Sequence, residues 1–251
     1  MAKLDEIVSF LDEELQIAEI PDYPGAHNGL QLQNGGEVEK VVSAVDASLP
    51  VIRKTIEQGA DLLVVHHGMF WQGVKPLTGA FYSKIKEAMD AGLSIYSAHI
   101  PLDIHPRLGN SVLLADAIGL KQSGTFMDWK GFDLGVSGEM EISLRELKER
   151  VSQAVNGPVL SCGDEDSTVG KVGIITGGAG SEIERVAKAG INTFITGEGP
   201  HWSHPLAEEL GLKFIYGGHY GTETFGVRAL VELLSDRFQT SASFVHYPTG
   251  L

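Results

Sequence analysis

A gapless internal repeat is the feature that most constrains the fold of this chain. Residues 40–68 align with residues 171–199 at a constant offset of 131 positions. Each copy predicts a strand, a helix, a glycine at which the helix ends, and a second strand. This matched order of elements predicts two related β-α-β units in one chain. Identical residues stand at five aligned positions, namely Lys40/Lys171, Val41/Val172, Ile52/Ile183, Gly59/Gly190 and Gly68/Gly199.

Short apolar runs rich in β-branched residues alternate with helical patterns along the chain. This alternation favours an α/β fold in which parallel or mixed sheets are flanked by helices. Ser143 and Glu146 have the spacing of a capping box at one helix start. The predicted strands are 41–46, 62–66, 93–98, 172–176, 192–196, 212–217 and 242–246. The predicted helices are an N-terminal amphipathic helix from Leu4, then 49–58, 80–91, 110–118, 143–155, 181–189, 203–210 and 223–236.

The length of 251 residues fits two domains of ordinary size. The stretch 121–137 lacks periodicity and is rich in glycine and aromatic residues, so it predicts a crossing between domains. A return is predicted near Gly217 and Gly218. The predicted domains are therefore a discontinuous one, 1–124 with 217–251, and an inserted one, 125–216.

Charge and cysteine content exclude several classes of function. The formal net charge is −14 and the pI is near 5.0, and such a surface repels nucleic acids and anionic lipids. The single cysteine, Cys162, excludes an internal disulfide and favours a reducing, cytoplasmic compartment. We expect Cys162 to be a small packing residue rather than a nucleophile. Acidic residues interrupt any apolar run in the N-terminal segment, so we do not expect a signal peptide there, and no stretch approaches the roughly 18 apolar residues of a membrane span.

Two adjacent histidines, His66 and His67, stand where a buried strand is predicted to end. Neighbouring side chains point to opposite faces within a strand, but this alternation relaxes at its end, so both rings can converge. Gly68 permits a turn or a close backbone approach at this point. Because neutral imidazole is a common metal ligand, the pair predicts half of a metal site.

The other half is predicted from two histidine–carboxylate pairs with equal spacing. His99 precedes Asp103 by four residues, and His219 precedes Glu223 by four, each just beyond a predicted strand. The carboxyl-end loops of α/β sheets usually form the binding site. Five protein ligands exceed the three of an open catalytic zinc site and suit two divalent ions, of Zn, Fe, Mn, Co or Ni, that activate a water. The predicted metal ligands are His66, His67, Asp103, His219 and Glu223.

The remaining histidines have simpler explanations to weigh. An isolated histidine is usually a surface residue or a satisfied core group, and we expect this of His27, His105 and His246. A pocket role stays open for His99, Glu198, His201 and His204. Glu198 aligns with His67 in the repeat, so it fits a general base, an orienting carboxylate or a helix-start residue. We predict proton transfer for His99, Glu198 and His201.

Two further segments lie close to these residues. Residues 176–182 form a glycine-rich turn that opens a helix, but they lack both standard phosphate-binding spacings, so a plain turn is favoured over an anion cradle. The aromatic residues Phe70, Trp71 and Phe81 follow the histidine pair. They line a pocket, stack on a ring, pack in the core or form a subunit contact.

Several distinctive motifs occur together and in a characteristic order. They are NGLQL at 28–32, GADLLVVHHGMFWQG at 59–73, H-x-PLD-x-HP-x-LGN at 99–110, TGGAG at 176–180, FITGE at 194–198 and GGHYGTETFGVRAL at 217–230. With these motifs the chain resembles the NGG-interacting-factor-like family, whose bacterial members, the YbgI-like proteins, are often named GTP cyclohydrolase I type 2. The likeness spans nearly the whole chain.

The resemblance implies two similar α/β domains, one inserted in the other, with a dinuclear metal site in the interdomain cleft. It implies the same five ligands, with Glu223 as the bridging carboxylate, and a toroidal homohexamer. Some relatives carry a second histidine where this chain has Tyr220. The cyclohydrolase name would mean attack at C8 of guanine and release of formate, although no residue can be assigned to guanine from the sequence.

We therefore expect a cytoplasmic, dinuclear-metal hydrolase-like protein whose metal-activated water attacks a small, nucleotide-like substrate. Two alternatives stay open. One is a non-catalytic metal-binding protein, such as a metal chaperone or a regulator. The other is an interaction scaffold that metal ions stabilise. The charge argues against nucleic acid as a partner.

Overall fold

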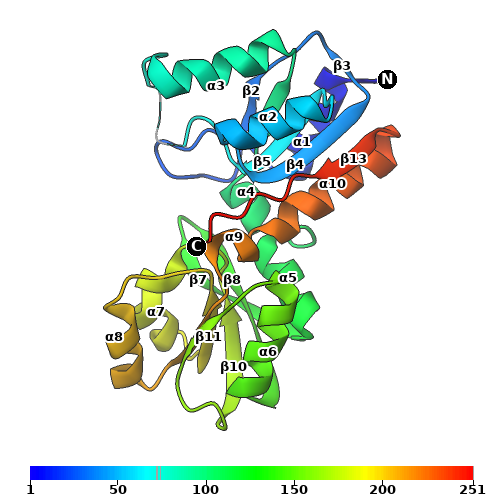
Figure 1. The fold of residues 1–251 in the computed structure, drawn as a ribbon. Helices are drawn as coiled ribbons and strands as arrows, with labels where there is room; N and C mark the ends of the chain where they lie inside the picture. The colour runs from blue at the N-terminus through cyan, green and yellow to red at the C-terminus, as the bar shows by residue number, and fades with distance from the viewer. Residues whose placement is uncertain (72, 74, 251) are drawn as a thin grey trace. The chain divides into compact units, whose positions relative to one another are not determined.

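The computed structural model describes residues 1–250 except Gln72 and Val74, and it divides into two compact α/β units (Figure 1). Unit 1 comprises Met1–Leu102 and Gly226–Tyr247, and unit 2 comprises Asp103–Phe225 with the tail from Pro248. The divisions fall within two helices, α4 (Ile100–Asp103) and α10 (Thr224–Phe238).

The two units divide inside α4 and α10, whereas the predicted domain boundaries near 124 and 216 were placed at glycine-rich stretches. Domains with those limits stay a prediction. Gln72, which belongs to the motif at 59–73, lies outside the described residues. Among the described residues, no helix is long and apolar enough to cross a membrane.

Unit 1 is built on a five-stranded sheet in the order β13-β4-β5-β6-β2. Its strands are parallel except for β2, which pairs antiparallel with β6, so the sheet is mixed as predicted. The bounds are β2 (Gly29–Leu32), β4 (Lys40–Asp46), β5 (Leu62–His67), β6 (Ser94–Ser97) and β13 (Ser241–Phe244). A separate antiparallel pair joins β1 (Ala2–Lys3) to β3 (Glu37–Val38).

Helices cover both faces of this sheet, which explains why its central strands are continuous apolar runs. α2 (Leu49–Glu57) and α3 (Gly79–Asp90) pack in one core with strand residues such as Leu63 and Ile95. Tyr96 points to the other face, where its hydroxyl donates to Asp12 of α1 (Leu4–Glu14) over 2.8 Å. On the same face α1 contacts α10 through the rings of Phe10 and Phe238.

Unit 2 contains a six-stranded mixed sheet in the order β7-β8-β10-β11-β12-β9. The three central strands β10, β11 and β12 are parallel, and the outer strands pair antiparallel. The bounds are β7 (Gln122–Trp129), β8 (Phe132–Ser143), β9 (Leu160–Cys162), β10 (Thr168–Ile174), β11 (Thr193–Thr196) and β12 (Lys213–Tyr216).

The strands β7 and β8 form where the sequence suggested an aperiodic crossing. They make an antiparallel hairpin over most of 121–137, and both belong to unit 2. The alternation of apolar residues is obscured because β7 is exposed over its first four residues and glycines replace side chains in β8. At Gly135, for example, an added Cβ would lie 2.4 Å from the ring of Phe126.

Two pairs of helices cover the unit 2 sheet, one pair on each face (Figure 1). α5 (Asn110–Ile118) and α6 (Leu144–Val155) share a core with Ile195 and Ile215. α7 (Ile183–Lys188) and α8 (Ser203–Leu210) share the other core with Phe194 and Phe214. The Ser143 hydroxyl accepts from the Glu146 N–H over 3.2 Å, which confirms the predicted cap of α6. Two short helices complete the unit, η1 (Ala179–Glu182) and α9 (His219–Thr222).

The two aligned segments of the sequence form strands that pair in the same register. In unit 1 Val41 lies opposite Leu62, and in unit 2 Val172 lies opposite Thr193, each residue 131 positions later. The glycines that follow the helices, Gly59 and Gly190, have φ values of 66° and 75°, which a glycine adopts without the steric cost of a Cβ.

Candidate metal centre

In unit 1, candidate ligands gather at the carboxyl ends of three adjacent parallel strands. Asp46 ends β4, His66 and His67 end β5, and His99 follows β6. Since β4, β5 and β6 are parallel neighbours, their carboxyl ends meet at one edge of the sheet. This is the edge at which α/β proteins build their sites.

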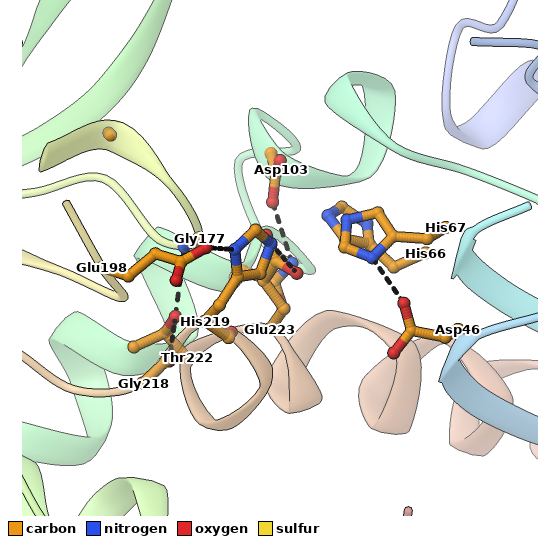
Figure 2. A network of polar contacts seen from close by, with 12 residues as sticks. Asp46, His66, His67, Asp103, Gly177, Glu198, Gly218, His219, Thr222 and Glu223 are labelled. Atoms are coloured by element: carbon orange, nitrogen blue, oxygen red, sulfur yellow. Dashed lines mark hydrogen bonds and ion pairs between the residues drawn. The ribbon is translucent and has the colours of Figure 1, made fainter. Parts of the chain in front are cut away.

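The two histidines of β5 are each fixed through their Nδ1 atoms. His66 is fully buried, and its Nδ1 lies 2.9 Å from the carbonyl oxygen of Ala98. His67 Nδ1 lies 2.9 Å from Asp46 Oδ1 (Figure 2). Because these oxygens accept, Nδ1 is the donor nitrogen of both rings and Nε2 is the nitrogen that could bind a metal ion. Ligand histidines of metal sites are commonly oriented in this way.

His99 joins the pair and is fixed in the same manner. Its Nδ1 lies 2.9 and 3.1 Å from the two carboxylate oxygens of Asp22. One ring nitrogen of each of His66, His67 and His99 lies within 4.8 Å of the others. Sequence analysis predicted His99 as a proton-transfer group, and the structure places it among potential metal donors as well.

Asp22 is a buried carboxylate whose role the sequence did not reveal. Burial raises the pKa of its carboxyl, but the hydrogen bond and charge of His99 and the hydrogen bonds from Asn28 and Tyr23 outweigh this, so the pKa lies below its ordinary value. The Asn28 amide donates to Asp22 over 2.8 Å, and its oxygen accepts from the His99 backbone N–H over 2.8 Å. Asn28 of the NGLQL motif therefore positions both partners of the pair.

The first residues after β5 contact a glutamine and bring a tryptophan beside the histidines. Gln31 Oε1 accepts from the Met69 N–H over 2.7 Å. A Cβ added to Gly68 would lie only 2.3 Å from Gln31 Nε2, so the glycine permits this close approach. The Trp71 ring contacts His99 at 4.3 Å and His67 at 4.8 Å between ring centroids. The aromatic side chain therefore forms a wall of the histidine group, one of the roles predicted for it.

In unit 2 the polar residues again follow the carboxyl ends of the parallel strands. Gly177 follows β10, Glu198 follows β11, and His219 follows β12. His219 Nδ1 lies 2.7 Å from Glu198 Oε1 (Figure 2), and its Nε2 lies 3.2 Å from Glu223 Oε2. The single imidazole of this group is thus held between two carboxylates.

These carboxylates control the protonation of His219. Burial lowers the pKa of the ring, but the hydrogen bonds and charges of Glu223 and Glu198 outweigh it and raise the pKa to about 9. His219 is therefore a cation at neutral pH when no metal is bound. A metal ion at Nε2 would have to replace that proton.

Glycines make room for the unit 2 group. A Cβ on Gly177 would lie 2.1 Å from Glu223 Oε1, and one on Gly197 would lie 2.7 Å from the Cα of His219. The Gly177 N–H donates to the Thr222 hydroxyl over 3.1 Å. The TGGAG turn thus seats Glu223 and His219 closely, which agrees with the plain turn that was favoured over an anion cradle.

Asp103 stands at the start of unit 2 and is fixed by Asn110. The amide of Asn110 donates to Asp103 Oδ1 over 2.8 Å. A Cβ on Gly109 would lie 2.4 Å from the carbonyl oxygen of Asp103, so the loop closes tightly. His105 is buried here, and its Nδ1 accepts from the N–H groups of Arg107 and Leu108, as expected of a satisfied core histidine.

Known proteins match the chain over nearly its whole length. The profile of the Duf34/NIF3 (NGG1p interacting factor 3) family matches residues 2–249. The chain belongs to the Duf34/NIF3 family. The resemblance predicted from the motifs is confirmed.

Relatives and solved structures agree with this family. A Deinococcus radiodurans protein named GTP cyclohydrolase 1 type 2 homolog is 38% identical over 249 residues, which cover 98% of this chain and 94% of that protein. An Escherichia coli K12 protein of the same name is 34% identical over 251 residues, 98% of each chain. The structure of protein ybgI, described as of unknown function, superimposes with a TM-score of 0.91 at 34% identity over 99% of this chain and 100% of that one.

Two other histidine candidates of this Duf34/NIF3 chain lie close to the start of α8. His201 lies in the turn that precedes this helix, and His204 lies in its first turn. His201 is exposed, and its carbonyl accepts from the His204 N–H over 3.2 Å. His204 faces Cys162 and Glu208. Sequence reasoning missed Asp22 and Asp46, and the only signal for Asp46 was its place at the end of a predicted strand.

Proposed function

We propose that this Duf34/NIF3 protein is a metal-dependent hydrolase that acts on a small, nucleotide-like molecule. In this proposal two divalent ions are held by His66 and His67 of unit 1 and by Asp103, His219 and Glu223 of unit 2. One observation carries it: His66, His67 and His219 all have Nδ1 against an oxygen, which makes Nε2 the ring nitrogen that could bind a metal ion.

The donor set fits such ions. Imidazole and carboxylate groups together suit Zn, Fe, Mn, Co and Ni. The seat that Gly177 leaves for Glu223 supports the fit, because any side chain there would fill the place of its carboxylate. Bound divalent ions would supply a Lewis acid and an acidified water.

The protein's own groups have separate roles in this proposal. Asp46 orients His67, and Glu198 orients His219, each through an Nδ1 contact. His99 transfers a proton, and Asp22 holds its ring, which is the arrangement of a general base and its orienting carboxylate. His201 is exposed and Glu198 already holds His219, so both are secondary candidates for proton transfer.

The substrate class rests on the relatives' name and on charge. Proteins named GTP cyclohydrolase 1 type 2 homolog support a nucleotide-like substrate with a guanine ring as the first to test. A chain with net charge −14 needs bound cations to attract an anionic nucleotide. A cytoplasmic homohexamer completes the proposal, and light scattering measures its mass directly.

Metal content of chelator-free protein tests the site. We expect His67→Ala and Glu223→Ala each to hold clearly less metal than the wild type, by up to two ions per chain, with His246→Ala, an exposed histidine, as the matched control. Loss of both ions from a variant in either unit would also indicate that the two groups share their ions. Metal-free protein after reconstitution with Zn, Mn and Fe would contradict the ligand assignment.

Turnover is the second test. Metal-loaded protein is incubated with guanosine and adenosine nucleotides, and formate and phosphate are measured. We expect release of product that stops on chelation and returns with metal. Tight metal binding without turnover on any nucleotide would instead favour a metal chaperone or regulator.

A further inference from the structure

A second group of metal-type side chains lies in unit 2, and none of its members belongs to the candidate metal centre. It consists of Cys162, His204 and Glu208, whose ligand atoms all lie within 4.8 Å of one another. The sequence showed no base near Cys162, because His204 stands 42 positions later in the chain. Only the fold brings the two together.

The secondary structure explains this convergence. Cys162 ends the short edge strand β9, which pairs antiparallel with β12 so that Cys162 lies opposite Phe214. His204 and Glu208 are four residues apart on α8, and this spacing puts them on one face of the helix. The Phe214 ring meets the His204 ring edge-on, at 5.5 Å and 90°, and fixes its orientation.

One nitrogen atom faces both partners. His204 Nδ1 lies 3.9 Å from Cys162 Sγ and 3.6 Å from Glu208 Oε2. Both distances are long for direct hydrogen bonds. They are close to the roughly 3.5 Å that separates neighbouring ligand atoms around a tetrahedral zinc ion with ordinary bond lengths. Three ligand atoms at these separations fit a cation site better than a hydrogen-bonded chain.

A reactive cysteine explains the group less well. Burial and the charge of Glu208 raise the pKa of the Cys162 thiol, so it stays protonated at neutral pH. A nucleophile–histidine–carboxylate triad also needs the thiol and the carboxylate on different ring nitrogens. Here both face Nδ1 of His204.

We propose that Cys162, His204 and Glu208 bind a zinc-type divalent ion at a site separate from the histidine groups at the strand ends. A thiolate with an imidazole and a carboxylate selects zinc over the harder cations magnesium and calcium. Three protein ligands leave the fourth position to water. Cys162 is 3% exposed at the base of the site, whereas the side chains of His204 and Glu208 are 42% and 64% exposed, so an ion can enter from solvent.

The bound ion would join α8 to the edge of the unit 2 sheet. β9 has only three residues and pairs only with β12 among the described strands. A ligand from β9 and two ligands from α8 would link these elements through one ion. We expect zinc to raise the melting temperature of the wild type by more than it raises that of a Cys162→Ser variant.

Cobalt substitution tests the proposal with a signal that the other site cannot produce. The chain has a single cysteine, so a thiolate-to-cobalt charge-transfer band in the near ultraviolet can arise only at Cys162. Full-length protein is titrated with Co(II), and the band is followed together with the visible ligand-field bands. We expect the saturated band to have the intensity of one thiolate-bound cobalt ion per chain, in addition to the cobalt that the strand-end groups take up.

Variants locate the signal on the three residues. Cys162→Ser should abolish the band, and Glu208→Gln should weaken cobalt binding at least tenfold. Glu209→Gln is the matched control, because its neighbouring side chain is exposed on the same helix and outside the group. Circular dichroism of each variant verifies that it is folded.

The outcome is independent of the proposed hydrolase. His67→Ala should keep the charge-transfer band while it loses metal from the other site. Absence of the band in folded wild type at saturating cobalt would overturn the proposal, as would a band that survives Cys162→Ser. Neither result bears on the ligands at the strand ends.

Discussion

The histidine group of unit 1 and the carboxylate-rich group of unit 2 lie on sheets whose central strands pair in the same register, yet they distribute their chemistry differently. In unit 1 the first strand supplies the orienting carboxylate, Asp46, and the second supplies the imidazole, His67. In unit 2 the positions 131 residues later are Gly177 and Glu198. In unit 2 the second strand, β11, is followed by the carboxylate of Glu198, which orients His219 after the third strand, β12.

This shift by one strand changes what each unit offers. Unit 1 presents three imidazoles, and an aspartate accepts from the Nδ1 atom of two of them, His67 and His99. Unit 2 presents one imidazole with a carboxylate at each nitrogen. The glycine at position 177 is the necessary counterpart of Asp46, because the space that an aspartate fills in unit 1 is taken by Glu223 in unit 2. One backbone plan thus yields a group rich in imidazoles and a group rich in carboxylates.

The largest expected effect separates proton transfer from metal binding. His99→Gln in unit 1 should lower kcat by about 10²–10⁴, which corresponds to roughly 3–5 kcal/mol, while metal content stays at the wild-type value. His201→Gln in unit 2, at an exposed histidine, should change kcat by less than about threefold. Steady-state kinetics with parallel metal analysis makes the measurement. Loss of metal from His99→Gln would assign this residue as a ligand instead.

The aligned glycines Gly68 and Gly199 should differ in their tolerance of a methyl group. In Gly199→Ala the added Cβ would lie 2.3 Å from the Tyr216 hydroxyl and 2.8 Å from the Cα of Gly180, so we expect a loss of about 2–3 kcal/mol of stability. In Gly68→Ala the three nearest atoms belong to the amide end of Gln31, which can move, so about 1 kcal/mol is expected.

Thermal unfolding compares the two variants under identical conditions. Gly190→Ala serves as a control for backbone strain alone, because φ is positive there and its Cβ would meet no atom within 4 Å. Equal losses for Gly68→Ala and Gly199→Ala would contradict the difference between a flexible neighbour and a rigid one.

The two carboxylates that orient ligand histidines, Asp46 and Glu198, should contribute equally to metal affinity although they lie at the carboxyl ends of different strands of their sheets. Asp46→Asn and Glu198→Gln should each weaken metal binding about 10–100-fold, because each removes the charge behind a ligand imidazole. Competition with a fluorescent chelator measures the affinities, and Glu182→Gln, at a partly exposed carboxylate that pairs with Arg185, is the control. An unchanged affinity in one variant alone would show that the two units do not use their carboxylates alike.

The helix caps provide the smallest contrast. Ser143→Ala should cost about 1 kcal/mol, since its hydroxyl accepts from Glu146 over 3.2 Å. Ser48→Ala should cost about half as much, because its bond to the Val51 N–H is longer, at 3.4 Å. The melting temperatures of the wild type and the two variants measure this difference. A larger loss of stability in Ser48→Ala than in Ser143→Ala would contradict the prediction.

The α/β class, the order of most elements and the strand ends at which polar residues gather could all be predicted from the amino-acid sequence. These features depend on local chemistry: apolar runs make buried strands, glycines end helices, and Ser143 caps α6 through a residue three positions away. The β7–β8 hairpin escaped prediction because exposed positions and glycines remove the period-two pattern.

The pairing of carboxylates and the thiol with particular histidines became apparent from the tertiary structure alone. Asp22 meets His99 across 77 positions, Asp46 meets His67 across 21, and Cys162 meets His204 across 42. No local pattern marks such pairs, because each residue alone looks like an ordinary polar or packing residue. Strand pairing and helix packing set these distances, and only once they are set does a buried carboxylate act on a particular imidazole, as Asp22 does on His99.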